Sequence, residues 1–233
     1  MAQALPRQAA EGDLRMDGLT RRWMAACALA EGIGIASAAA ATRLTNPDSS
    51  PDLWPVLGGA AAAAFIEGSA LGVLQGRVVR DSLAGVSVQR WWIPTVTVAF
   101  VGWTLGSVPA TMASGGAEPS LWLVVLGAVG LGAAMGAVFG AAQRLAIRHL
   151  PGSSRWIWAN VAGWAAAMPV IYLGASLPSA STPTAAVVVI GAAAGALAGA
   201  ALGAVTGPAL RGLSDASTSQ AAAIGSGYQR RAS

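Results

Sequence analysis

The sequence predicts an all-α membrane protein with six transmembrane helices, and three observations carry this prediction. Only 10% of the 233 residues are charged and 55% are hydrophobic, whereas a soluble domain carries roughly 25% charged residues. Apolar runs of about 20 residues, the length that crosses a bilayer, recur along the chain. Residues 191–207 repeat glycine at every fourth position, which suits close packing of membrane helices.

The apolar runs place the six helices and the polar segments around them. Residues 1–20 are predicted to be a disordered cytoplasmic tail, residues 21–211 a transmembrane domain, and residues 214–233 a second disordered cytoplasmic tail. The first apolar run follows basic residues as in a signal peptide, but it belongs to the internal repeat described below. The expected helices cover residues 23–41, 53–76, 91–112, 121–143, 156–176 and 184–207.

The distribution of arginine predicts the topology. Six helices place both tails on one side, and 13 of the 14 basic residues, all arginines, lie on that side. Arg43 alone lies on the other. Because arginine in short loops marks the cytoplasmic side, both termini are expected in the cytoplasm, and the protein is expected to be a multi-pass protein of the bacterial cytoplasmic (inner) membrane.

Tryptophan gathers at the predicted helix ends. Amphipathic rings at such positions are typical of the belt at the membrane–water interface. Trp103 and Trp164 lie deeper and are expected to pack between helices. The seven tryptophans of the predicted belt are Trp23, Trp54, Trp91, Trp92, Trp122, Trp156 and Trp158.

The chain contains an internal repeat of helix pairs. Its three copies cover about 21–83, 89–150 and 154–213, and each begins on the same side of the membrane, so the copies have parallel topology. A pseudo-three-fold bundle and a linear row of hairpins both fit this pattern. The odd helices open with Arg22-Trp23, Arg90-Trp91 and Arg155-Trp156. The even helices share the series Gly68, Gly72, Gln75, Arg80; Gly136, Gly140, Gln143, Arg148; and Gly199, Gly203, Thr206, Arg211.

The glycine stripes of the even helices resemble a glycine zipper. Positions i and i+4 share one helix face, so the glycines of 191–207 form a flat stripe. Ordinary helix packing explains such a stripe, and the alternative is a sliding or gating interface. In the bundle, the glycine-striped even helices are expected to make the inner contacts.

Two acidic residues fall inside apolar runs. Glu31 lies eight residues beyond Trp23 and Glu67 lies thirteen residues before Arg80, which places both at about 12–20 Å from the same membrane face. Intramembrane carboxyls are costly and indicate a functional site. The pair is therefore a candidate proton or cation site. If the two meet, we predict that at least one carries its proton at neutral pH; a neutral structural latch is the alternative.

Other polar residues lie near the inner membrane face. A candidate polar ring consists of Gln75, Gln143, Thr206 and Asn160; hydrogen bonding between helices is the favoured interpretation of these residues, and a pathway mouth is the alternative. Arg80, Arg148 and Arg211 are expected to bind anions or lipid phosphates at the inner face.

The residue inventory excludes several classes of function. Cys27 and His149 are the only cysteine and the only histidine, so no metal site and no cofactor is predicted. The arginines lie in short loops between apolar runs, so nucleic acid is not an expected partner. The expected partners are the lipid bilayer and, beyond it, other membrane subunits or further copies of the chain. No catalytic constellation emerges, and an enzyme is the least favoured class.

Two segments resemble a pattern in uncharacterised bacterial polytopic membrane proteins. Residues 140–148 read Gly-Ala-Ala-Gln-Arg-Leu-Ala-Ile-Arg, and residues 156–164 read Trp-Ile-Trp-Ala-Asn-Val-Ala-Gly-Trp. Gln75, Trp92, Gly102 and Trp103 extend the resemblance in part to the second and third helices. The residue after Gln143 is arginine, where the pattern has tryptophan. The resemblance implies a bacterial inner-membrane protein and no particular activity.

The best functional hypothesis is a small transporter or permeation pathway for a small solute or ion, in which Glu31 and Glu67 couple to protons or cations. The alternative is a non-catalytic accessory or assembly subunit of a larger membrane complex.

Overall fold

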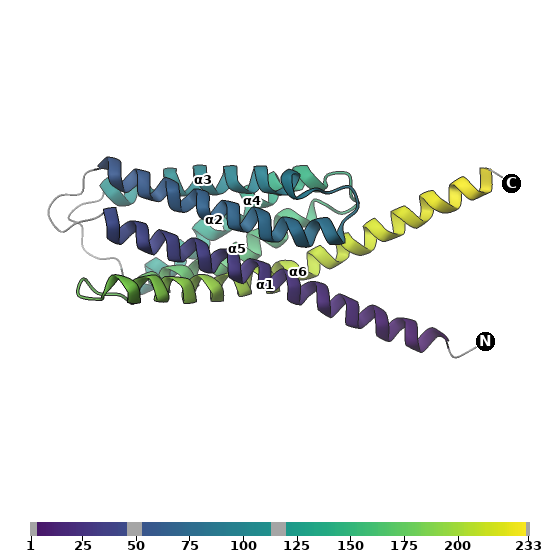
Figure 1. Ribbon diagram of the computed structural model, residues 1–233, viewed down its shortest axis with the longest axis horizontal. Helices are drawn as coiled ribbons and strands as arrows, with labels where there is room; N and C mark the ends of the chain where they lie inside the picture. The colour runs from purple at the N-terminus through teal and green to yellow at the C-terminus, as the bar shows by residue number, and fades with distance from the viewer. Residues whose placement is uncertain (1–3, 46–52, 113–119, 232–233) are drawn as a thin grey trace.

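The computed structural model describes residues 4–45, 53–112 and 120–231, with side chains placed over 18–45, 54–104 and 120–219. Within these ranges the chain is entirely helical apart from its turns (Figure 1). The six helices are α1 (Ala4–Thr45), α2 (Leu53–Ser82), α3 (Val88–Met112), α4 (Leu121–Ile147), α5 (Arg155–Ala175) and α6 (Thr184–Arg231).

Five of these helices are long and apolar enough to cross a membrane, namely all except α3. The described side chains of α3 end at Thr104. The predicted outer loop at 46–52 lies outside the described residues, as does the segment 113–119. The fold is thus that of a multi-pass membrane protein with at least five candidate spans in the described part of the chain.

The first and last helices are longer than the sequence analysis predicts. α1 begins at Ala4 and α6 ends at Arg231, where disordered tails were expected at 1–20 and 214–233. Both segments contain alanine, the strongest helix former, as at residues 9–10 and 221–223, and each helix continues past its apolar run. Tertiary contacts also order the start of the second segment. The hydroxyl of Ser214 donates to the carbonyl of Ser82, and the Ser217 hydroxyl accepts a bond from the backbone amide of Ala84.

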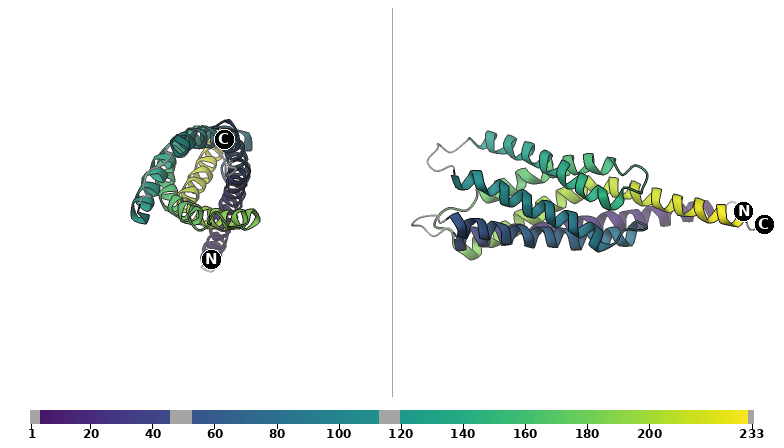
Figure 2. Two further views of the ribbon diagram at one scale, coloured as in Figure 1. Left: turned by 90° about the vertical axis from the view of Figure 1, so that its left-hand side faces the viewer. Right: turned by 90° about the horizontal axis from the view of Figure 1, so that it is seen from above.

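The helices form a closed ring in chain order. Each helix packs against the next one along the chain, and α6 closes the ring by packing against α1. The end-on view of Figure 2 shows this arrangement. α1 and α6 project beyond the other helices at the same end of the bundle, so the two termini lie on one side (Figure 1).

The glycine stripe of each even helix contacts an odd helix. A Cβ atom on Gly199 of α6 would come within 3.0 Å of the Cys27 backbone of α1. Equivalent close approaches join Gly72 of α2 to Trp92 of α3, and Gly136 of α4 to the Asn160 backbone of α5. The predicted tight packing is therefore present, but the stripes do not meet one another at the centre. Each faces the next odd helix around the ring.

Two apolar clusters fill the ring, with a polar layer between them. One cluster, at the end of the bundle where the termini lie, contains Trp23, Trp91 and Trp156; the other contains Leu71 and Phe139 among its buried residues. Along α2, α4 and α6, the buried polar residues that separate the two clusters are Gln75, Gln143 and Thr206.

Candidate functional site

Three tryptophans meet at the centre of the ring. Trp23, Trp91 and Trp156 come from the first turns of the apolar parts of α1, α3 and α5, and none is more than 1% exposed. Their ring centroids are 5.6–6.3 Å apart with interplanar angles of 64–82°, so each ring packs edge-on against the other two. Aromatic pairs favour this edge-to-face geometry. The three side chains, here called the tryptophan triangle, close the centre of the bundle at this end.

Each ring of the tryptophan triangle donates a hydrogen bond to an even helix. Trp91 Nε1 lies 3.3 Å from Gln75 Oε1, and Trp156 Nε1 lies 3.0 Å from Gln143 Oε1. Trp23 Nε1 lies 2.7 Å from Thr206 Oγ1. The partner is each time the polar residue that the sequence analysis aligned in the even helices. Burial of an indole N–H requires such a partner, because an unmade hydrogen bond in this setting is costly.

The glutamine amides connect the helices further. Gln143 Nε2 lies 3.2 Å from both Gln75 Oε1 and Thr95 Oγ1, and Gln75 Nε2 donates to Cys27 Sγ at 3.4 Å. Asn160 Nδ2 instead donates to the Trp156 carbonyl of its own helix, at 2.9 Å. The structure therefore brings the two glutamines of the candidate polar ring together, whereas Thr206 bonds to Trp23 and Asn160 bonds within its own helix.

The predicted location of these tryptophans was wrong. The sequence analysis placed Trp23, Trp91 and Trp156 in the interfacial belt, but they are buried inside the bundle. Their shared repeat position, each beside an arginine and one turn before Cys27, Thr95 or Asn160, is the signal that distinguishes them. Three other tryptophans of the predicted belt, Trp54, Trp122 and Trp158, are 76%, 68% and 73% exposed. Trp164 packs between helices as predicted, with its ring stacked on Phe139 at 5.0 Å.

The two intramembrane carboxyls are buried and close together. Glu31 of α1 is 0% exposed and Glu67 of α2 is 1% exposed. The Glu67 side chain packs on Gly34, three residues beyond Glu31. The glycine leaves the space that this side chain fills.

The two carboxyls differ in their hydrogen bonds. Glu67 Oε1 accepts a bond from Trp103 Nε1 at 3.0 Å. Neither oxygen of Glu31 has a hydrogen-bond partner among the residues that the structure describes. A carboxyl kept only as a latch between helices would be bonded, because burying a polar group without a partner costs roughly 2–7 kcal/mol. Glu31 is therefore not explained by helix packing.

A cavity of about 90 Å³ between α1 and α2 reaches Glu67. It extends from Thr45, at the end of α1, along a wall of alanines to Glu67 and Trp103. Glu67 lies eleven residues from Val56 at the far rim, or about 16 Å at 1.5 Å per residue. The cavity wall is mostly apolar, and its polar groups lie at its two ends: Thr42 and Thr45 at one, and Glu67 with Trp103 at the other.

The carboxyl pair has no counterpart at the positions of the other helices that the sequence analysis aligned with it. The residues eight positions after Trp23, Trp91 and Trp156 are Glu31, Ala99 and Trp164. The residues thirteen positions before Arg80, Arg148 and Arg211 are Glu67, Met135 and Ala198. Apolar side chains therefore occupy the aligned positions of the other helices. Ala99, Trp164 and Ala198 belong to the second apolar cluster, and Met135 packs against it. Packing symmetry does not require acids here.

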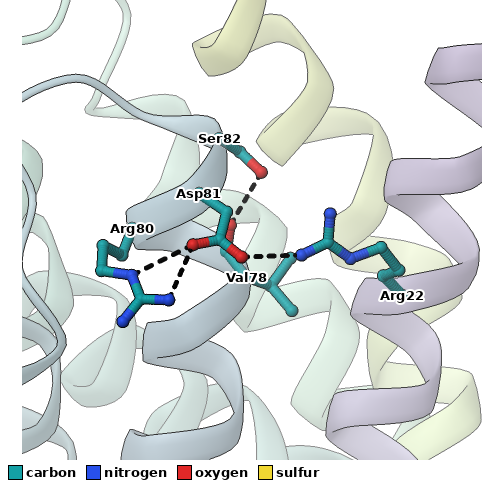
Figure 3. A network of polar contacts seen from close by, with 5 residues as sticks. All are labelled: Arg22, Val78, Arg80, Asp81 and Ser82. Carbon is teal, nitrogen blue, oxygen red and sulfur yellow. Dashed lines mark hydrogen bonds and ion pairs between the residues drawn. The ribbon is translucent and has the colours of Figure 1, made fainter.

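The three inner-face arginines have different surroundings. Arg80 donates two hydrogen bonds to Asp81, which also pairs with Arg22 (Figure 3). Arg148 is exposed beside a groove between α3 and α4, and Arg211 is half-buried on α6.

Comparisons of the chain with protein-family models, with curated proteins and with solved structures found no match. The class of the protein therefore rests on its own architecture: a helical, multi-pass membrane protein with a closed ring of helices and a buried carboxyl pair.

Proposed function

We propose that the six helices are three parallel two-helix repeats around a pseudo-three-fold axis, with both termini in the cytoplasm of a bacterium and the helices in its inner membrane. The cyclic order of the contacts supports this. Each aligned tryptophan bonds to the even helix of the preceding copy, and Trp23 of the first copy bonds to the last copy. The arginine bias supports the cytoplasmic placement of the termini.

Labelling of single cysteines tests the topology. In a Cys27→Ser background, cysteine substituted at Gly85 and at Gly152, both at exposed turns, should be labelled by a membrane-impermeant maleimide only after the membrane is opened. A cysteine substituted at Ser179, in the turn between α5 and α6, should be labelled in intact cells. Labelling that places Gly85 and Gly152 on opposite faces would exclude three parallel copies.

We further propose that the protein is a small transporter or permeation pathway for a small solute or ion, with Glu31 and Glu67 as its proton- or cation-binding pair. One observation carries this proposal. Glu31 is fully buried with no hydrogen-bond partner in the described part of the chain, next to a second carboxyl that lines a cavity. A group that must gain and lose a proton or bind an ion needs an oxygen that the fold leaves available.

The proposed pathway has two parts. The α1–α2 cavity leads from the end opposite the termini to Glu67. Beyond Glu31, the chain offers Cys27, one turn away on α1, and then Gln75 and Gln143, which are joined to Cys27 by a chain of hydrogen bonds. The tryptophan triangle closes the cytoplasmic end of this polar series. In this proposal, the cavity gives access to the carboxyl pair from one side and the tryptophan triangle blocks access from the other, as alternating access requires.

Reconstituted protein tests the role of the pair. Liposomes containing a pH-sensitive dye, or given radioactive sodium outside, are driven with a potassium diffusion potential. Flux above protein-free liposomes is expected, and Glu31→Gln or Glu67→Gln should lower it about tenfold or more because the titratable group is gone. Asp215→Asn, an exposed acid on α6, is the matched control.

The Glu→Gln variants should fold at least as well as the native chain, because a neutral amide costs less to bury than a carboxylate. Flux that survives replacement of both acids would exclude the carboxyl pathway.

The accessory-subunit alternative rests on a different observation. In the most apolar stretch of α4, only 17% of the residues are buried within the chain. The corresponding share in the other four candidate spans is 33–39%. Purification in a mild detergent tests this alternative: a partner that co-purifies and dissociates when α4 is altered would favour it, and a lone monomer would argue against it.

A further inference from the structure

A large groove separates α3 from α4 at the end of the bundle where the termini lie. These two helices pack less closely than any other neighbouring pair in the ring. The groove has a volume of about 960 Å³, with Arg90, Arg148 and His149 at its rim and with apolar side chains such as Ile93 and Leu145 along its walls. This volume lies near the upper end of the range of about 300–1,000 Å³ that small-molecule pockets have.

In the first repeat, α1 and α2 are the helices equivalent to α3 and α4. There the equivalent arginines are neutralised by an acidic residue. Arg22 of α1 and Arg80 of α2 both pair with Asp81, each at 2.9 Å (Figure 3). One carboxylate on the closing turn thus balances an arginine from each helix of the pair.

The second repeat carries the same two arginines without that acid. Arg90 precedes Trp91 as Arg22 precedes Trp23, and Arg148 follows Gln143 by five residues as Arg80 follows Gln75. The residue after Arg148 is His149, whose Nε2 lies 3.0 Å from the carbonyl of Ala84. The only ion pairs of the described side chains are those of Asp81. Arg90 and Arg148 therefore face the groove as two positive charges with no acidic counterpart in that part of the chain.

The groove continues along α4 as a shallow, open apolar strip. A second hollow of about 520 Å³ shares Ala142 and Leu145 with the first and extends along Ala141 and Val138 to Ala137. From Arg148 to Ala137 is eleven residues, or about 16 Å along the helix. This length matches one leaflet of a hydrocarbon core about 30 Å thick. The charged end of the surface thus lies at headgroup level and the apolar end reaches toward the middle of the bilayer.

From this charge and shape we propose that an anionic glycerophospholipid occupies the α3–α4 groove. Its phosphate takes the place between Arg90 and Arg148 that Asp81 has between Arg22 and Arg80, and an acyl chain lies along Leu145, Ala142 and Val138. Arginine suits this role because its guanidinium binds phosphate oxygens with directed hydrogen bonds. The bound lipid completes the helix pair that the protein leaves open. The proposal does not depend on the carboxyl pathway.

Native mass spectrometry of the full chain tests the proposal. The protein is released from nanodiscs of phosphatidylglycerol and phosphatidylcholine, and the lipids that stay bound are counted. Bound phosphatidylglycerol should be enriched about tenfold over its share in the nanodisc, as expected of two arginines at the membrane surface. Arg90→Gln/Arg148→Gln should abolish the enrichment. The matched control is Arg22→Gln/Arg80→Gln, which should leave it unchanged.

Two further variants separate the headgroup from the acyl chain. His149→Asp supplies in the second repeat the acid that Asp81 supplies in the first, and should remove the preference for phosphatidylglycerol without removing any arginine. Ala142→Trp places a large side chain where the acyl chain would lie and should displace the lipid, while Arg90 and Arg148 stay unchanged. Inorganic phosphate at millimolar concentration should not compete with the lipid, because it lacks the acyl chain.

Several outcomes would overturn the proposal. These are an undiminished phosphatidylglycerol preference in Arg90→Gln/Arg148→Gln, equal losses in the Arg22→Gln/Arg80→Gln control, or displacement of the lipid by inorganic phosphate. A dimer or a co-purified protein that Ala142→Trp dissociates, with no bound lipid in the native chain, would also overturn it and would assign the groove to a protein helix. Variants that do not run as folded monomers on size exclusion are replaced by Arg90→Lys/Arg148→Lys. This variant should retain the preference for phosphatidylglycerol in part, because lysine keeps the charge and loses the forked hydrogen bonds of arginine.

Discussion

Replacing single glycines by alanine tests whether backbone contact between α1 and α6 stabilises the ring. A Cβ atom on Gly199 would come within 3.0 Å of the Cys27 backbone, where no flexible side chain can yield. The added methyl therefore forces the two helices apart. Overpacking of this kind costs about 1–3 kcal/mol, which exceeds the gain of about 1 kcal/mol that alanine has over glycine in a helix interior.

The chain supplies its own control. Gly130 lies in the middle of α4, and a Cβ atom there would meet nothing within 4 Å. Gly130→Ala keeps the same change in residue type and adds its methyl where the structure has free space. It should leave the free energy of unfolding unchanged or raise it by up to about 1 kcal/mol, as helix propensity alone predicts.

Unfolding with sodium dodecyl sulfate in mixed micelles, followed by circular dichroism, measures both variants against the native chain. We expect Gly199→Ala to lower the midpoint of unfolding and Gly130→Ala not to lower it. Equal shifts in the two variants would refute the reasoning, because glycine would then act through propensity and not through the approach of two backbones. Gly136→Ala, which meets the Asn160 backbone of α5, should repeat the loss on a second pair of helices.

Two other predictions concern the polar layer under the tryptophan triangle. Gln143→Leu removes the acceptor of Trp156 and the donor to Gln75 and Thr95. At about 0.6 kcal/mol for each hydrogen bond within a membrane protein, it should lower the free energy of unfolding by about 2 kcal/mol in the same assay. A loss no larger than that of Arg77→Gln, at an exposed position of α2, would contradict the network. Cys27 is 0% exposed, so N-ethylmaleimide should leave it unmodified in the folded protein and label it within the same time after denaturation; Trp23→Ala, which opens the triangle beside it, should speed the labelling of the folded chain, and rapid labelling of the native chain would contradict the burial.

The sequence alone predicted the features that depend on local composition and spacing. Low charge and long apolar runs predicted the membrane class, since hydrocarbon tolerates few charged groups. Helical spacing predicted that the glycines of α6 share one face and that Glu31 and Glu67 lie at similar depth. The two inferences from helical spacing need only the rise and period of a helix, so they required no knowledge of which helices are neighbours.

The tertiary structure decided which helices meet. The glycine stripes pack on the next odd helix and not on one another, because ring closure pairs α6 with α1. The same pairing carries Trp23 inward to Thr206 and away from the interface that its place near a helix end suggested. It also leaves Glu31 without a hydrogen-bond partner among the described residues. Depth along a helix is a one-dimensional property of the chain, whereas the partner of a side chain depends on the rotation and position of other helices, which no single segment encodes.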